Sequence, residues 1–129
     1  MITASLTNYR QSPRKVRSVA NLVRGKSVEQ ALNTLNFLSK KAADPLYGLL
    51  MSAIANAKNN FNFLKEGLMI KELRVDVGQT MKRRMPRARG NSYPINKRNS
   101  HVRLVLEMKP EKKAKEIKEP KAVIKKEKK

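Results

Sequence analysis

The feature that most constrains this chain is the segment 77–106, which contains eight basic residues and no acidic one. Apolar and polar residues alternate at both of its ends, at 72–77 and at 102–106, and this period of two is typical of strands. Residues 78–100 are too many for a plain connection in a compact domain. We expect them to form two strands that run beyond the sheet, turn near residues 87–92 and return. A hairpin with so few apolar residues is poorly stable alone, so it needs a surface to lie against.

The basic residues of this segment suit contact with phosphate groups. Arginine outnumbers lysine between residues 81 and 90, and a guanidinium group binds phosphate with two hydrogen bonds and stacks on bases. Pro86 and Gly90 shape the backbone near the bend, and Tyr93 has a ring on which a base can stack. The alternative is a disordered basic arm, but the strand-like flanks favour a return to the sheet. The predicted contacts are Lys82, Arg83, Arg84, Arg87, Arg89, Lys97, Arg98, His101 and Arg103.

The charge of the whole chain points the same way. Thirty Lys and Arg stand against ten Asp and Glu, which gives a net charge of +20. Such an excess repels itself in a compact state, and a polyanion relieves the repulsion while releasing its counterions. Nucleic acid is therefore the expected partner. A free nucleic-acid-binding regulator and a membrane-surface protein recruited by the Lys-rich C-terminus are the alternatives.

Residues 1–76 have the pattern of a folded α+β platform. Ile2, Ala4 and Leu6 alternate with polar residues and predict a short strand. A first helix is predicted after Ser12, with proline at its first position, and it carries an apolar face as far as residue 23. Gly25 suits the left-handed position that follows a helix.

Two more helices are predicted before the sheet resumes. Ser27 and Gln30 have the spacing of a capping box, in which each side chain bonds to the other's backbone N–H. The apolar residues between 46 and 57 predict a third helix, with Pro45 in or near its first turn because deeper it would break hydrogen bonds. Beyond residue 67 the period changes to two, with Leu73, Val75 and Val77 on one face.

The first helix carries a second group of basic residues. No acidic residue precedes Glu29, so pairing within the helix cannot neutralise them. A solvated helix face is the ordinary outcome for surface charge, but here we favour contact with phosphates. The predicted contacts in this part are Arg10, Arg14, Lys15, Arg17, Arg24 and Lys26.

Catalysis and metal binding have little support. His101 is the sole histidine, and there is no cysteine for a nucleophile, a thiolate metal site or a disulfide. Residues 25–27 lack the upstream glycine of a P-loop. No apolar stretch approaches the length that spans a bilayer, and the N-terminus lacks a signal peptide. We expect no cofactor and no metal, and a location in the cytosol or in an organelle that makes the protein itself.

Five short motifs, in order, resemble the large-subunit ribosomal protein twenty-two family. They are SPRKVR at 12–17, LVRGK at 22–26, SAIANA at 52–57, MKR with PRARG at 81–90, and KRNSH at 97–101. The resemblance covers about residues 1–108. It implies three helices packed on a three-stranded antiparallel sheet, with a long protruding β-hairpin at about 78–100. Residues 109–129 lie outside it, and their Lys/Glu-rich composition predicts a disordered or partly helical tail.

The resemblance also implies a function. The family is a structural constituent of the large ribosomal subunit, not an enzyme, and it binds the large ribosomal RNA during assembly. Its partners would be that RNA, neighbouring large-subunit proteins and the nascent peptide, with no membrane contact and no homo-oligomer. Its hairpin tip lines the nascent-peptide exit tunnel and affects macrolide action and the sensing of arrest peptides. By position, the tunnel-lining residues here would be Met81, Lys82, Arg83, Arg84, Arg87, Ala88, Arg89, Gly90, Asn91 and Ser92.

The chain departs from the family's pattern in the hairpin. Residues 77–79 are Val-Gly-Gln where Glu-Gly-Pro is common. Asn91 and Ser92 stand where Arg and Ala are usual, which lowers the charge of the tip and leaves arrest-peptide sensing open. Pro94 is unusual in the return arm and predicts a local break in strand pairing.

Overall fold

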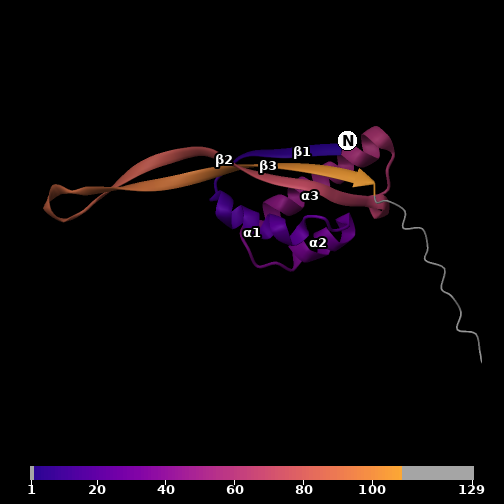
Figure 1. Cartoon of the computed structure of the whole chain (residues 1–129), viewed down its shortest axis with the longest axis horizontal. Coiled ribbons are helices and arrows are strands. Elements are labelled where there is room, and N and C mark those ends of the chain that lie inside the picture. Colours follow the sequence, from indigo (N-terminus) through magenta and orange to yellow (C-terminus); the bar gives the residue numbers. More distant parts are fainter. Residues whose placement is uncertain (1, 109–129) are drawn as a thin grey trace, which may run out of the picture.

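The computed structural model describes residues 2–108 and has the predicted α+β architecture (Figure 1). The strands are β1 (Ile2–Tyr9), β2 (Leu68–Pro86) and β3 (Ser92–Met108), and the helices are α1 (Pro13–Val23), α2 (Val28–Asn36) and α3 (Ala43–Phe61). Two single 3₁₀ turns, Lys65–Gly67 and Ala88–Gly90, precede β2 and join β2 to β3. The prediction made for the tail lies outside the described residues.

The three strands form one antiparallel sheet in the order β1-β3-β2. Val102 of β3 lies between Leu6 of β1 and Val75 of β2. The pairing of β1 ends at Tyr9, opposite Ser100, whereas β2 and β3 stay paired as far as Pro86 and Ser92. The protruding hairpin is therefore the part of β2 and β3 that extends beyond the end of β1. We call residues 78–100 the hairpin and the other described residues the platform.

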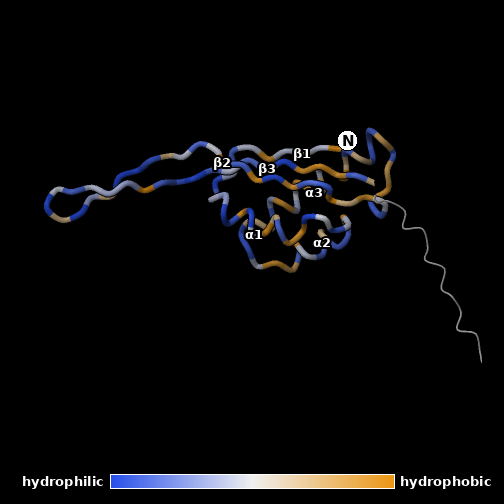
Figure 2. Tube along the Cα trace, in the orientation of Figure 1, coloured by the Kyte–Doolittle hydropathy of each residue, from blue (hydrophilic) through white to orange (hydrophobic). Residues whose placement is uncertain are grey.

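Apolar side chains from the helices and one sheet face form the core of the platform. Figure 2 shows hydrophobic stretches along the helices and strands of the platform, whereas the hairpin is mostly hydrophilic. The alternation in β3 is as predicted, since Val102, Leu104 and Leu106 are all buried. In β2, both Ile70 and Leu73 are buried although they are three positions apart, a spacing that would place them on opposite faces of a regular strand. A register shift between Ile70 and Glu72 causes this, because Lys71 has no partner in β3 and the side-chain alternation restarts after it.

Val77 lies on the same sheet face as Val75, as predicted, because the pairing runs without a shift between them, but the core does not reach it. Its side chain is 59% exposed, while Val75 is buried. The pairing of β2 shifts a second time between Val77 and Thr80, where the hairpin begins to leave the helices. No apolar surface covers the strand from this point, so the alternation no longer leads into a core.

The predicted helix starts are correct, but the capping box at Ser27 is wrong. Neither Ser12 nor Ser27 uses its side chain as a cap. The backbone before α2 is instead paired with β2: the Gly25 N–H donates to Ile70 O at 3.1 Å, and the Ile70 N–H donates to Lys26 O at 3.0 Å. Gly25 has the predicted left-handed conformation, with φ of 76°. Strand pairing therefore orients this connection.

Candidate nucleic-acid interface

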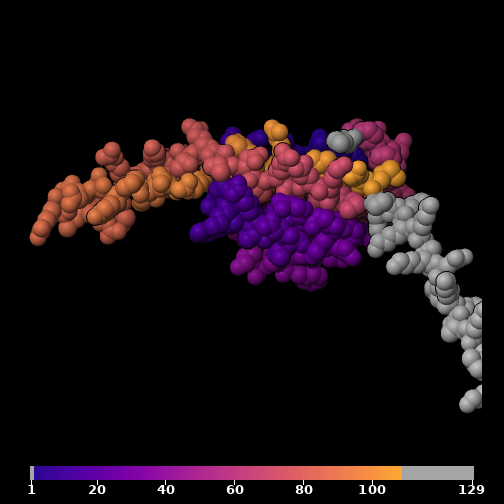
Figure 3. Space-filling view, in the orientation of Figure 1, coloured from indigo at the N-terminus to yellow at the C-terminus, as the bar shows by residue number. Residues whose placement is uncertain are grey.

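Beyond Thr80 and Arg98, the hairpin is a two-stranded ribbon that projects past the platform (Figure 3). Its register runs without a shift from Thr80 opposite Arg98 to Pro86 opposite Ser92. Every residue from 82 to 98 is exposed. The predicted break at Pro94 is wrong, since Pro94 pairs with Arg84 inside the continuous ladder. Both strands of such a ribbon are edge strands. Proline lacks a backbone N–H, and on an edge strand the position of that N–H can face solvent, so the pairing is kept.

The tip is ordered by its own backbone. The Arg87 N–H donates to Asn91 O at 2.8 Å, and the Asn91 N–H donates to Ala88 O at 3.4 Å. Arg89 and Gly90 have positive φ angles of 56° and 72°. The Arg87 guanidinium lies over the Tyr93 ring, 5.7 Å from its centroid, which is a cation–π contact. The tip thus presents cations on a defined turn.

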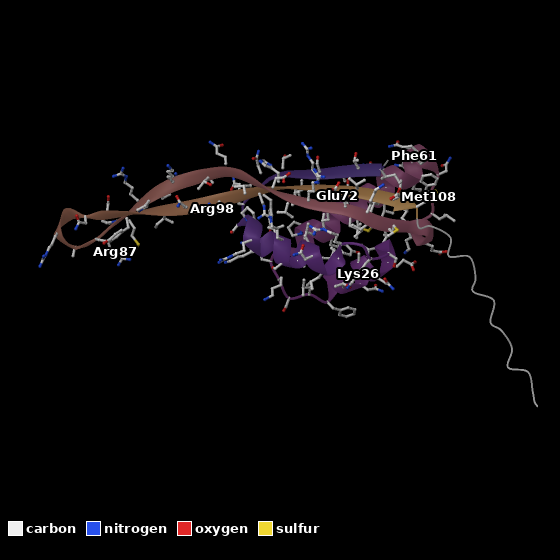
Figure 4. The ribbon with its side chains drawn as sticks, in the orientation of Figure 1. Lys26, Phe61, Glu72, Arg87, Arg98 and Met108 are labelled. Atoms are coloured by element: carbon white, nitrogen blue, oxygen red, sulfur yellow. The ribbon has the colours of Figure 1, made fainter. Side chains whose placement is uncertain are left out.

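Within the part of the chain that the structure describes, the cations of the hairpin have no acidic partner. Within residues 2–108, the ion pairs are Lys71 with Glu107, at 3.0 Å, and Glu72 with Arg74, and both lie on the platform. Figure 4 shows Arg87 and Arg98 projecting from the ribbon well away from Glu72. Charges left unpaired on a narrow projection attract a polyanion from several sides.

The base of the hairpin brings together two cations that lie far apart in the sequence. Arg14 of α1 and Arg98 of β3 line one groove of about 400 Å³, together with Ser12, Pro13 and Val77. Arg10 and Lys15 are exposed nearby along the chain. Lys26 lies among the helices, distant from Arg87 and Arg98 (Figure 4). The predicted contacts of the hairpin and those at its base therefore adjoin one another, and Lys26 is separate from them.

Two of the predicted phosphate contacts are engaged inside the protein. Arg17 donates from Nε and Nη2 to Val75 O, at 3.0 and 2.8 Å, and Arg24 donates from Nη2 to Leu73 O at 2.7 Å. Because β2 is an edge strand, these carbonyls have no partner strand. The two arginines satisfy them and join α1 to β2. No local pattern indicated this role, since it depends on which strand lies at the edge.

The open face of the sheet carries Arg103, a predicted contact, beside Arg74, which was not among the predicted contacts. Arg74 and Arg103 are directly opposite one another on β2 and β3, and like charges in that arrangement repel. Glu72 pairs with Arg74, so Arg103 has no acidic partner within residues 2–108. A groove of about 510 Å³ runs beside them, lined also by Thr3 and Ser5. This face offers a second, smaller position for an anion.

His101 has a structural contact at the base of the hairpin. Its Nδ1 accepts a hydrogen bond from the Asn8 N–H at 3.1 Å, and Asn8 has a left-handed φ of 56°. Gly78 lies against the same ring: a Cβ placed there would be 2.9 Å from His101 Nε2 and 3.2 Å from the Asn99 carbonyl carbon. Sequence analysis singled out His101 but not Asn8 or Gly78, although a glycine inside a strand pattern indicates close packing.

A further bond holds β1 beside this base. The Tyr9 hydroxyl donates to Lys41 O at 3.1 Å. Burial, and to a smaller extent the Asp44 carboxylate, raise the pKa of Tyr9 above its usual value. The phenol therefore stays protonated and keeps this bond at neutral pH.

Replacing Gly78 with alanine tests the packing at the hairpin base. The added methyl group overlaps the His101 ring and the Asn99 backbone, so we expect the free energy of unfolding to fall by about 1–3 kcal/mol, the usual cost of overpacking. The backbone amide resonance of Asn8 should shift, because its acceptor moves. Urea unfolding and a ¹⁵N–¹H correlation spectrum measure both effects.

Gly48→Ala is the matched control for this variant. Nothing lies within 4 Å of a Cβ at Gly48, which is inside α3. Alanine there should stabilise the helix by up to about 1 kcal/mol. If Gly78→Ala were as stable as this control, the His101 ring would have room to move. The tight packing at Gly78 would then contribute nothing to the free energy of unfolding.

Within residues 2–108, no group of three His, Cys, Asp or Glu side chains is placed to hold a metal ion. No helix in that part of the chain has the length and apolar character required to cross a bilayer.

Comparison with known proteins identifies the family. The family model described as ribosomal protein L22p/L17e matches residues 4–107. A protein named large ribosomal subunit protein uL22 from Herpetosiphon aurantiacus is 47% identical over 104 residues, covering 81% of this chain and 92% of its own. The chloroplast-type uL22c of Marchantia polymorpha is 44% identical over 109 residues, covering 84% and 92%. The uL22 of Deinococcus radiodurans is 46% identical over 97 residues, covering 75% and 72%. The match includes β1, all three helices and both hairpin arms, and so the chain belongs to the L22p/L17e family of ribosomal proteins.

Proposed function

We propose that this chain is a structural component of the large ribosomal subunit that binds its RNA and lines the exit tunnel with the hairpin tip. The observation that carries the proposal is the exposed hairpin, whose cations have no acidic partner within the described residues. Such a ribbon gains its counter-charge from RNA phosphates, and the platform holds it at a fixed position. The family relationship supports the same assignment and a role without catalysis.

The proposed RNA contacts fall into three groups. The hairpin supplies Lys82, Arg83, Arg84, Arg87, Arg89, Lys97 and Arg98. The base and first helix supply Arg10, Arg14, Lys15, His101 and, beside their bonds to β2, Arg17 and Arg24. Lys26 and Arg103 are separate contacts on the platform. Residues 1–108 would form the single domain, and residues 109–129 a Lys/Glu-rich low-complexity tail.

The proposed partners beyond RNA are neighbouring large-subunit proteins and the nascent peptide at the tip. The chain would act as one copy in each subunit and not as a homo-oligomer. Its place is the ribosome, of the cytoplasm or of an organelle, and the relationship to the chloroplast-type uL22c accords with the second possibility.

Sedimentation tests this function against its two alternatives. In a sucrose gradient at high magnesium, we expect the full-length chain to migrate with large subunits. A chain without residues 110–129 should do the same, because the predicted RNA contacts all lie before the tail. Full-length chain that stayed at the top of the gradient would indicate a free nucleic-acid-binding regulator. Localisation to membranes that disappeared with the tail would indicate a membrane-surface protein.

A further inference from the structure

The register of the hairpin divides its side chains between two faces. Paired residues of an antiparallel ribbon point to the same side, and the next pair points to the other. The pairing is continuous from residue 80 to residue 86, so this alternation holds along both arms. One side, which we call the apolar face, carries Met81, Arg83, Met85, Tyr93, Ile95 and Lys97. The other, the polar face, carries Thr80, Lys82, Arg84, Pro86, Ser92, Pro94, Asn96 and Arg98.

All the large apolar side chains of the arms gather on the apolar face. Met85, Tyr93 and Ile95 are 44%, 60% and 41% exposed. They adjoin one another, because Met85 is opposite Tyr93, and Ile95 is two residues further along β3. Nothing in the described chain covers them, and a contiguous exposed apolar strip marks an interaction surface. The polar face holds no comparable strip.

We propose that the apolar face lies on unstacked bases of the large-subunit RNA and that the polar face lines the aqueous tunnel. This inference rests on the proposed function and adds to it the orientation of the hairpin about its own axis. It separates Met81 and Arg83, on the RNA side, from Lys82 and Arg84, on the tunnel side, within a segment that the family resemblance treats as one.

The chemistry of the apolar face fits RNA better than a peptide. The face combines an aromatic ring and flexible apolar chains with Arg83 and Lys97, and it carries no acid. Bases stack on aromatic rings and on guanidinium planes, while cations contact the adjoining phosphates. The Arg87 guanidinium already lies over the Tyr93 ring, so a cation and an aromatic ring are adjacent at this end of the face. A nascent peptide has no fixed sequence, so it offers neither constant negative charge nor regular aromatic faces.

The polar face suits a wall along which chains of every sequence must pass. Lys82, Arg84 and Asn96 would remain hydrated at the wall and bind an apolar nascent segment weakly, while the long chains of Lys82 and Arg84 reach sideways to phosphates beside the tunnel. Arg98 lies further back, in the groove with Arg14 at the base of the hairpin. The apolar face in that position would retain such segments, because burial of apolar surface is favourable. Placing that face on RNA also removes its own apolar surface from water.

Photo-crosslinking from adjacent positions tests the orientation. Ile95 and Asn96 are neighbours in the chain on opposite faces, so each can be replaced by p-benzoylphenylalanine in ribosomes carrying a radiolabelled, stalled nascent peptide. We expect the ratio of RNA to peptide crosslinks to be several-fold higher from position 95 than from position 96. The same substitution at positions 85 and 84 repeats the comparison on β2. This second pair provides the result if a variant at 95 or 96 fails to assemble into ribosomes.

The outcomes separate this inference from the proposed function. Equal ratios at the two positions, or a higher ratio from 96 and 84, would overturn the orientation while leaving the hairpin in the tunnel. Ribosomes that contain the variants but yield neither RNA nor peptide crosslinks at any of the four positions would overturn the tunnel assignment itself.

Discussion

Replacing Arg83, Arg84, Arg87 and Arg89 with alanine is expected to weaken binding to large-subunit RNA on the order of a hundredfold, since four exposed ion pairs contribute up to about 1 kcal/mol each. The dependence on salt should change as well. Each phosphate contact adds about 0.7–0.9 to the slope of log affinity against log salt, so the slope should fall by about 3. All four side chains are exposed and form no hydrogen bond or ion pair with another side chain in the described structure. The exposed cation–π contact of Arg87 with Tyr93 is the interaction lost, so the free energy of unfolding should fall by no more than about 1 kcal/mol. Filter binding at several salt concentrations and urea unfolding provide the measurements.

The control for this variant removes the same charge from the platform. Lys40, Lys41, Lys58 and Lys65 are all exposed, and replacing them with alanine also lowers the formal charge from +20 by four, to +16. We expect the slope to stay close to that of the unchanged protein. Equal losses of RNA affinity in the two variants would mean that binding depends only on the total charge. The hairpin would then not be the RNA-binding surface.

Replacing Arg17 and Arg24 with methionine is expected to lower the free energy of unfolding by about 2 kcal/mol. Hydrogen bonds from charged donors are worth about 1.5–3 kcal/mol each, and solvent screening reduces that value here because both arginines are only partly buried. Methionine keeps most of the side-chain length, so the packing of α1 changes little. The loss of stability then measures the hydrogen bonds to the Val75 and Leu73 carbonyls. The midpoint and slope of urea unfolding measure the effect.

Arg14 and Lys15 provide the matched pair on the same helix. Neither side chain makes a hydrogen bond within the described structure, and both are exposed. Their replacement with methionine should weaken RNA binding and leave unfolding unchanged. Should the Arg17 and Arg24 variant unfold like the unchanged protein and lose only RNA affinity, the bonds to β2 would contribute nothing in solution. The basic stripe on α1 would then act as one RNA-binding face.

The hairpin was predictable because its signals are local. Two alternating runs, a long acid-free segment between them and the turn-forming residues at 87–92 are all visible along the chain. The helix starts at Ser12 and Ser27 and the left-handed Gly25 depend equally on neighbouring residues. The contacts named from the sequence stay a prediction for RNA, which the variants above can test.

The features that local signals did not predict have a different origin. The capping box at Ser27 does not form because the backbone beside it pairs with β2, which is more than forty residues away in the sequence. Val77 lies on the predicted face but is exposed, because the sheet leaves the helices there. Pro94 interrupts nothing because the ribbon has two free edges. Each outcome depends on what lies next to the residue in space.

By itself, the sequence determined the helices, the strands and the uncompensated charge of the hairpin, since periodicity and charge are properties of neighbouring residues. Only the tertiary structure decided that β2 is an edge strand whose carbonyls engage Arg17 and Arg24, that the Lys71 bulge restarts the alternation, and that the apolar side chains of the hairpin share one face. Strand order and register decide these features, and both follow from pairing between segments far apart in the chain, which no local pattern encodes.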